Sequence, residues 1–93
     1  MKTGLEEIQQ ERNEQIHKHN RQVKDDVMNN PNEELKKAAV AMLTNDEFEF
    51  PEHWNFFRKE KMLNNKSYRQ RLIVAGALIA AEIDRLNALE KLK

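Results

Sequence analysis

An uninterrupted run of apolar residues near the carboxyl end, Leu72 to Ala81, constrains the fold most strongly. In a helix this run is apolar on every side, and such a helix has to be buried on every side. It is about half as long as a membrane-spanning helix, so we expect it in a protein core. Two further helices in a 93-residue monomer are barely enough to cover it. We therefore expect a homo-oligomer that forms through residues 72–81, where Gly76 and Ala80, like Ala77 and Ala81, permit close approach of another helix.

The composition favours a few long helices. Only two Gly and two Pro are present, so tight turns are few and a sheet of many short strands is disfavoured. An apolar share of 39% and a charged share of 34% suit helices that bury one face and solvate the other. The fold class we predict is all-α: a small helical bundle of two long helices plus one or two short ones, in a single domain over residues 1–93.

Local signals set the expected helix boundaries. A first helix is predicted over 3–28, opened by a capping box of Thr3 and Glu6. A second is predicted to start around residues 30–31 and to stop near residue 44, and a short one follows residue 51. The last helix is predicted over 67–92, opened by a capping box of Ser67 and Gln70.

The charge balance and the lack of cysteine exclude several classes of protein. Sixteen basic and sixteen acidic residues give a net charge of zero, which argues against a general nucleic-acid coat protein. With no cysteine, the chain has neither disulfides nor a thiolate metal site. The start of the chain has no apolar signal segment, so we expect a cytoplasmic protein without membrane association.

Several polar residues fall on helical faces that should be buried. On a helical wheel, Arg12 and His19 lie in the middle of the apolar face of the first helix, and Gln15 lies towards its edge. The residues that make up this face are Leu5, Ile8, Ile16, Val23 and Val27. In the last helix, Glu82 lies on the face shared by Tyr68, Leu72, Ala75, Ile79 and Leu86.

A buried carboxylate has to be paired, and Arg12 is the partner expected for Glu82. One interpretation is structural: an Arg12–Glu82 pair, with His19 nearby, fixes the alignment of the helices. The other is a polar ligand pocket between helices, lined by Arg12, Gln15, His19 and Glu82. An arginine fork suits a phosphate or a carboxylate.

Two further groups could contact a ligand. Most of the aromatic residues fall between 48 and 57, and this segment, which includes Trp54, is either a hydrophobic plug or a stacking wall for a ligand ring. Tyr68, Arg69 and Arg71, together with Lys66, lie at the start of the last helix, where free N–H groups favour an anion. The cationic group could equally be a solvated helix end.

No motif for catalysis or metal binding is present. His17 and His19 are two residues apart on a helix and point nearly opposite ways, which disfavours a shared metal. There is no P-loop, dinucleotide-binding glycine pattern or zinc-binding H-E-x-x-H. No catalytic residue, metal ligand or cofactor is predicted, which favours a protein that is not an enzyme.

Three segments carry a resemblance to a known family: G-L-E-E-I-Q-Q-E-R-N-E-Q-I-H-K-H-N, E-L-K-K-A-A-V-A-M-L and R-L-I-V-A-G-A-L-I-A-A-E-I-D-R-L. They resemble a widespread family of small helical proteins of bacteriophages and prophages, over nearly the whole chain. The resemblance implies shared polar positions at Glu11, Arg12, Gln15, His19, Glu82, Asp84 and Arg85. It also implies that the cytoplasm is that of a host cell.

Three functions follow as hypotheses. The first, to which the resemblance contributes, is an anti-defence sponge that sequesters a nucleotide or cyclic-nucleotide second messenger without cleaving it. The second is a metal-dependent, MazG-like nucleotide pyrophosphohydrolase, which needs several carboxylates converging on Mg²⁺. The third is an inhibitor or adaptor that binds a host protein through the aromatic segment 48–57.

Overall fold

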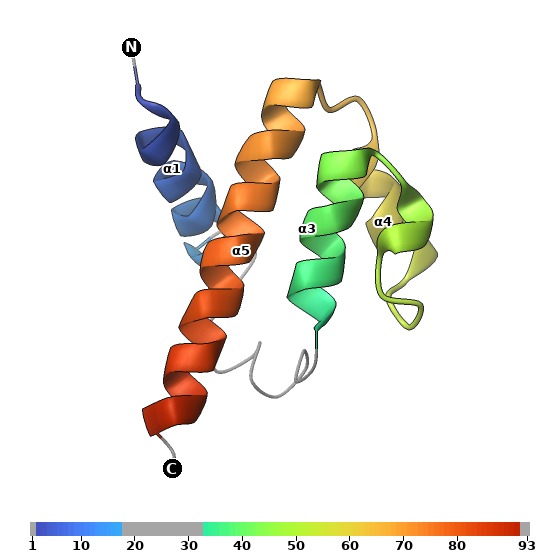
Figure 1. Ribbon diagram of the computed structural model, residues 1–93. Helices are drawn as coiled ribbons and strands as arrows, with labels where there is room; N and C mark the ends of the chain where they lie inside the picture. Colours follow the sequence, from blue (N-terminus) through green and yellow to red (C-terminus); the bar gives the residue numbers. More distant parts are fainter. Residues whose placement is uncertain (1, 18–32, 92–93) are drawn as a thin grey trace.

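The computed structural model describes residues 2–17 and 33–91, and all regular structure in these two ranges is helical. The elements are α1 (Gly4–His17), α3 (Glu34–Thr44), the 3₁₀ helix η1 (Glu47–Glu49), α4 (Phe56–Leu63) and α5 (Tyr68–Lys91) (Figure 1). The all-α prediction is therefore confirmed. The expected first helix is found as far as His17, and its continuation to residue 28 lies outside the described residues, as does the expected start of the second helix.

Both predicted capping boxes are formed. The Glu6 amide donates to Thr3 Oγ1 at 3.2 Å, and the Thr3 amide donates to Glu6 Oε1 at 3.2 Å. At the start of α5, the Gln70 amide donates to Ser67 Oγ at 3.1 Å, and the Ser67 amide donates to Gln70 Oε1 at 2.8 Å. Each box supplies acceptors to amides that the helix itself leaves without partners.

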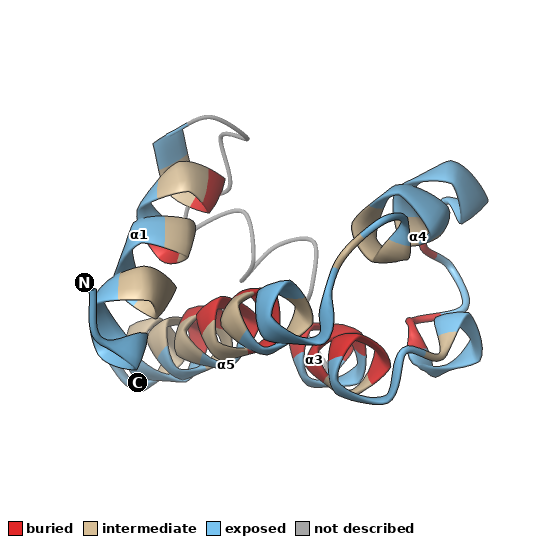
Figure 2. Ribbon diagram, turned by 90° about the horizontal axis from the view of Figure 1, so that it is seen from above, coloured by how far each residue is buried: buried red, intermediate tan, exposed pale blue. Residues whose placement is uncertain are grey.

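Helix α5 is the central element, and α3 and α1 pack on two of its sides. Figure 1 shows α3 beside α5 and running in the opposite direction, and Figure 2 shows α1 and α4 on opposite flanks of this pair. Helix α3 ends at Thr44, as predicted, because Asn45 adopts a left-handed conformation (φ 55°) that ends a helix and that asparagine tolerates.

The core lies between α3 and α5 and is closed by two aromatic side chains. The largest fully buried side chains are Leu35, Met42 and Leu78. Phe50 and Trp54 are buried against them, with ring centroids 6.0 Å apart. The plug interpretation therefore holds for these two residues, whereas Phe48, Phe56 and Phe57 of the same segment are exposed. The other members of the core are Ala38, Ala39, Ala41, Val74, Ala75 and Ala81, with Met62 and Leu63 packed against it.

The contact between α1 and α5 depends on a glycine. A Cβ atom placed on Gly76 would lie 2.7 Å from Ile8 Cδ1 and 2.9 Å from Ile8 Cγ1, so Ile8 occupies the space that a larger side chain would take. We expected Gly76 to admit a second copy of the chain; it admits α1 of the same chain instead. Ala77 and Ala81, in the same expectation, are fully buried within the chain.

Several residues expected to be buried are exposed, among them Leu5, Leu43 and Tyr68. Leu5 is 80% exposed, although it falls on the apolar face of the wheel. A wheel orders residues around a helix but does not say how far along the helix the neighbour extends. Leu43 is 44% exposed, because it lies about 100° round α3 from the buried Met42. Tyr68 is 65% exposed.

None of the described helices is both long enough and apolar enough to cross a lipid bilayer.

Whether Gly76→Ala lowers or raises the stability of the fold should depend on the side chain at residue 8. Gly76→Ala should destabilise the fold by about 1 kcal/mol, because overpacking against Ile8 outweighs the better helix propensity of alanine. In an Ile8→Ala background the same substitution should stabilise by about 1 kcal/mol, since only the propensity gain is left. Urea unfolding of the four proteins measures both values. Equal effects in the two backgrounds would contradict this packing.

The Thr3–Glu6 box predicts a pH dependence. The hydrogen bonds from Thr3 hold the pKa of Glu6 below its ordinary value of 4.5. Because the folded-state pKa is lowered, this stabilisation is complete above pH 4.5 and is lost as the pH falls through the folded value. The melting temperature of wild type should therefore drop towards that of Glu6→Gln as the solution is acidified. A constant difference between the two proteins would contradict the prediction.

Candidate functional site

The candidate site is centred on Arg12, which lies where α1 crosses α5. Its side chain is 8% exposed, although arginine is seldom buried without a partner. Arg12 Nη2 donates to Asp84 Oδ2 on α5 at 3.2 Å. This bond joins residues 72 positions apart and connects the two helices. The wheel prediction that Arg12 occupies a buried face is confirmed.

The predicted pairing of Arg12 with Glu82 was wrong. Glu82 pairs with Arg85 on its own helix, through bonds of 2.6 Å from Nε to Oε1 and 2.9 Å from Nη2 to Oε2. Both side chains of this pair are largely buried. Glu82 and Asp84 are about 160° apart around α5. The wheel placed Glu82 correctly among neighbours of its own helix, but it could not tell on which side α1 would pack.

Arg12 and its neighbour Gln15 keep polar atoms without partners. Among the residues that the structure describes, Arg12 Nε, Arg12 Nη1 and Gln15 Oε1 are buried and accept or donate no hydrogen bond. The amide nitrogen of Gln15 donates to Glu11 Oε2 at 3.3 Å, which fixes the side chain one turn along α1. Leaving such buried groups unpaired costs about 1–3 kcal/mol each, and more for a charged group. The site thus presents two unused donors beside one unused acceptor.

Lys66, at the start of α5, adds positive charge near this site. Burial lowers the pKa of the Lys66 ammonium, while attraction to the Glu11 carboxylate opposes that shift. Lys66 Nζ also donates to the Lys61 carbonyl at 3.4 Å. Lys66 therefore lies within electrostatic range of Glu11, which precedes Arg12 on α1.

The two predicted arginines at the start of α5 have different partners. Arg69 pairs with Glu7 of α1, whereas Arg71 Nη1 donates to the Met42 carbonyl at 3.1 Å. The Arg71 guanidinium lies 5.7 Å from the ring centre of Tyr68. The cations at the start of α5 thus have separate partners and do not converge.

Trp54 is part of the core, with the Arg58 guanidinium 3.9 Å from its ring centre. His19 lies outside the described residues. Of the four residues predicted to line a polar pocket, Arg12 and Gln15 are together on α1, and Glu82 is held by Arg85.

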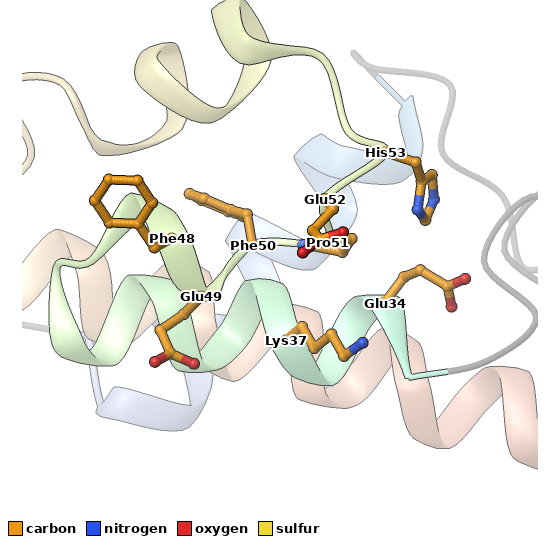
Figure 3. A pocket seen from close by; sticks show the side chains of 8 residues that line it. All are labelled: Glu34, Lys37, Phe48, Glu49, Phe50, Pro51, Glu52 and His53. Carbon is orange, nitrogen blue, oxygen red and sulfur yellow. The ribbon is translucent and has the colours of Figure 1, made fainter.

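Sequence reasoning missed a second feature, a pocket of about 430 Å³ between α3 and the segment that follows it. Figure 3 shows Phe48 at one end and His53 at the other, with Glu34 and Lys37 contributed by α3. Its remaining lining residues are Glu49, Phe50, Pro51 and Glu52. The acidic and aromatic character of residues 46–52 was visible in the sequence, but the pocket depends on how that segment folds over α3.

Within residues 2–17 and 33–91, no three histidine or carboxylate side chains are grouped so that they could hold a metal ion. Comparisons of this chain with models of known protein families, with curated proteins and with solved structures find no match.

The Arg12–Asp84 bond predicts that neutralising Asp84 lowers the stability of the fold more than neutralising Glu33 does. Asp84→Asn should destabilise the fold by about 1–2 kcal/mol, because it removes the charged partner of a buried arginine from a position that is itself 46% exposed. The matched control is Glu33→Gln, which breaks the exposed pair with Lys36 and should leave unfolding unchanged. Chemical denaturation measures both. Equal results would mean that the Asp84 bond does not hold α1 on α5.

Proposed function

We propose that this protein binds a small phosphate-bearing ligand, of the nucleotide or cyclic-nucleotide class, at Arg12 and releases it intact. The observation that carries the proposal is a guanidinium that is buried, is bonded to Asp84 through one nitrogen, and has two further nitrogens without partners among the described residues. Phosphate oxygens are strong acceptors for arginine N–H groups. A bound anion would also offset the charge that Arg12 buries.

Gln15 supports a ligand that has donors as well as acceptors. Its buried Oε1 requires an N–H or O–H group, which an inorganic anion such as sulfate lacks. A nucleotide carries phosphate oxygens together with ribose hydroxyls or a base amino group. One molecule of this class can therefore satisfy Arg12 and Gln15 at once.

The biological role we propose is sequestration of a nucleotide second messenger. The resemblance to small phage proteins motivates this role, and the site supplies hydrogen bonds and charge for holding a ligand. An oligomer would increase the number of such sites in each particle. The pyrophosphohydrolase alternative makes a different prediction for the same experiment, since it requires the nucleotide to be cleaved.

Titration with nucleotides and cyclic dinucleotides, with and without Mg²⁺, tests the proposal by calorimetry and native mass spectrometry. Wild type should retain an intact nucleotide. Arg12→Gln should weaken binding by about 10- to 100-fold, the value of a charged hydrogen bond. Arg58→Gln is the matched control: it removes an arginine that lies over Trp54, and it should leave affinity unchanged.

Circular dichroism of Arg12→Gln separates loss of binding from loss of folding. A variant that keeps wild-type helicity and loses the ligand supports the proposal. Wild type that binds no compound of the panel would make Arg12 a structural residue, and release of pyrophosphate with Mg²⁺ would favour the hydrolase.

A second candidate function, binding of a host protein, is favoured by three exposed aromatic rings. Phe48 is 87% exposed, Phe57 76% and Phe56 60%, and aromatic side chains are frequent anchors in protein interfaces. These rings lie on η1 and α4, away from α1, so this function would use a different surface from the one around Arg12 (Figure 2).

A further inference from the structure

One side of α5 remains apolar and exposed although α1 and α3 cover its other sides. Leu72 is 39% exposed, Ile79 46%, Leu86 47% and Ile83 53%. These four residues and Tyr68, which we call the α5 stripe, recur at helical spacing and occupy one side of the helix. Aliphatic side chains in such a row are typical of a helix that packs against another helix.

The spacing within the α5 stripe is symmetrical. Leu72 lies seven residues before Ile79, and Leu86 lies seven residues after it. Seven residues are close to two helical turns, so all three lie nearly in line. If two copies of α5 pack in opposite directions with the Ile79 residues facing each other, Leu72 of each copy meets Leu86 of the other.

The charges that flank the α5 stripe distinguish the two possible orientations. Arg69 lies beside the stripe at the start of α5, and Glu90 lies in line with Leu72 near the end of α5. Parallel copies would place both Arg69 residues at one end of the contact and both Glu90 residues at the other. Antiparallel copies bring Arg69 of one against Glu90 of the other. Arg69 keeps a side chain that is 65% exposed while it pairs with Glu7, so it can reach a second carboxylate.

We infer that the α5 stripe is a dimer interface, in which two copies of this chain pack α5 against α5 in antiparallel orientation with Ile79 on the two-fold axis. An interface of this symmetry uses the same patch on both copies, which the mirrored spacing of Leu72 and Leu86 provides. This inference revises the expected contact: it uses the large aliphatic residues of 72–86, and Gly76 is occupied by Ile8 within the chain. It does not depend on the ligand proposed for Arg12.

The first experiment measures the mass of the full chain by analytical ultracentrifugation over the micromolar to millimolar range. Wild type should sediment as a dimer. Ile79→Lys should raise the dissociation constant by about 100-fold or more, because both copies lose an apolar contact and two ammonium groups are brought together. Phe57→Lys, which places the same charge at an exposed apolar residue of α4, should leave the dimer intact.

The second experiment determines whether the two copies of α5 are parallel or antiparallel. The chain has no native cysteine, so only the introduced cysteines can form disulfides. Leu72→Cys and Leu86→Cys are prepared separately, mixed and oxidised. Antiparallel packing predicts a disulfide between one chain of each kind and little cross-linking of either variant alone. Parallel packing predicts the reverse.

Three outcomes would overturn the inference. They are a wild-type monomer at every concentration, a dimer that Ile79→Lys leaves unchanged, and cross-linking of each variant only with itself. A monomer that binds lipid vesicles through residues 72–86 would overturn it as well and would assign the α5 stripe to a membrane surface. Because none of these measurements uses a nucleotide, their failure is distinguishable from failure of the ligand proposal.

Discussion

The structure depends on covering α5, which is apolar around its circumference from Leu72 to Ala81. Burial of apolar surface is the main favourable term in folding, so the other helices are placed where they remove most of that surface from water. Helix α3 covers one side with Leu35 and Met42, and Phe50 and Trp54 close that core. The side bearing Ile79 stays exposed, because α1 and α3 pack on other sides of α5 and α4 packs beside η1.

The contact between α1 and α5 is built differently from the core, and this difference is what makes it a candidate site. Ile8 approaches Gly76 closely, and two ion pairs also join α1 to α5: Arg12 with Asp84, and Arg69 with Glu7. A buried polar contact stabilises only when its hydrogen bonds are complete. Arg12 is incompletely paired among the described residues, so the interaction that attaches α1 is also the place where a ligand would contribute most.

Two parts of the molecule therefore differ in chemistry. The polar contact at Arg12 offers donors, an acceptor and charge, which suit a small polar molecule. The α5 stripe offers aliphatic area with opposite charges at its two ends, which suits a second copy of the chain. The polar contact lies between α1 and α5, whereas the α5 stripe lies on another side of α5, so neither proposal depends on the other.

Local features were determined by the sequence itself. Both capping boxes, the end of α3 at Thr44, the burial of Arg12 and the incomplete covering of α5 all followed from residue types and helical spacing. Such features can be read from residue types and from the spacing within a single helix. The pairing of Arg12 with Asp84, the use of Gly76 by Ile8, and the pocket beside α3 were decided only by the tertiary structure. These depend on which side of one helix meets another, and the periodicity of a single helix does not contain that information.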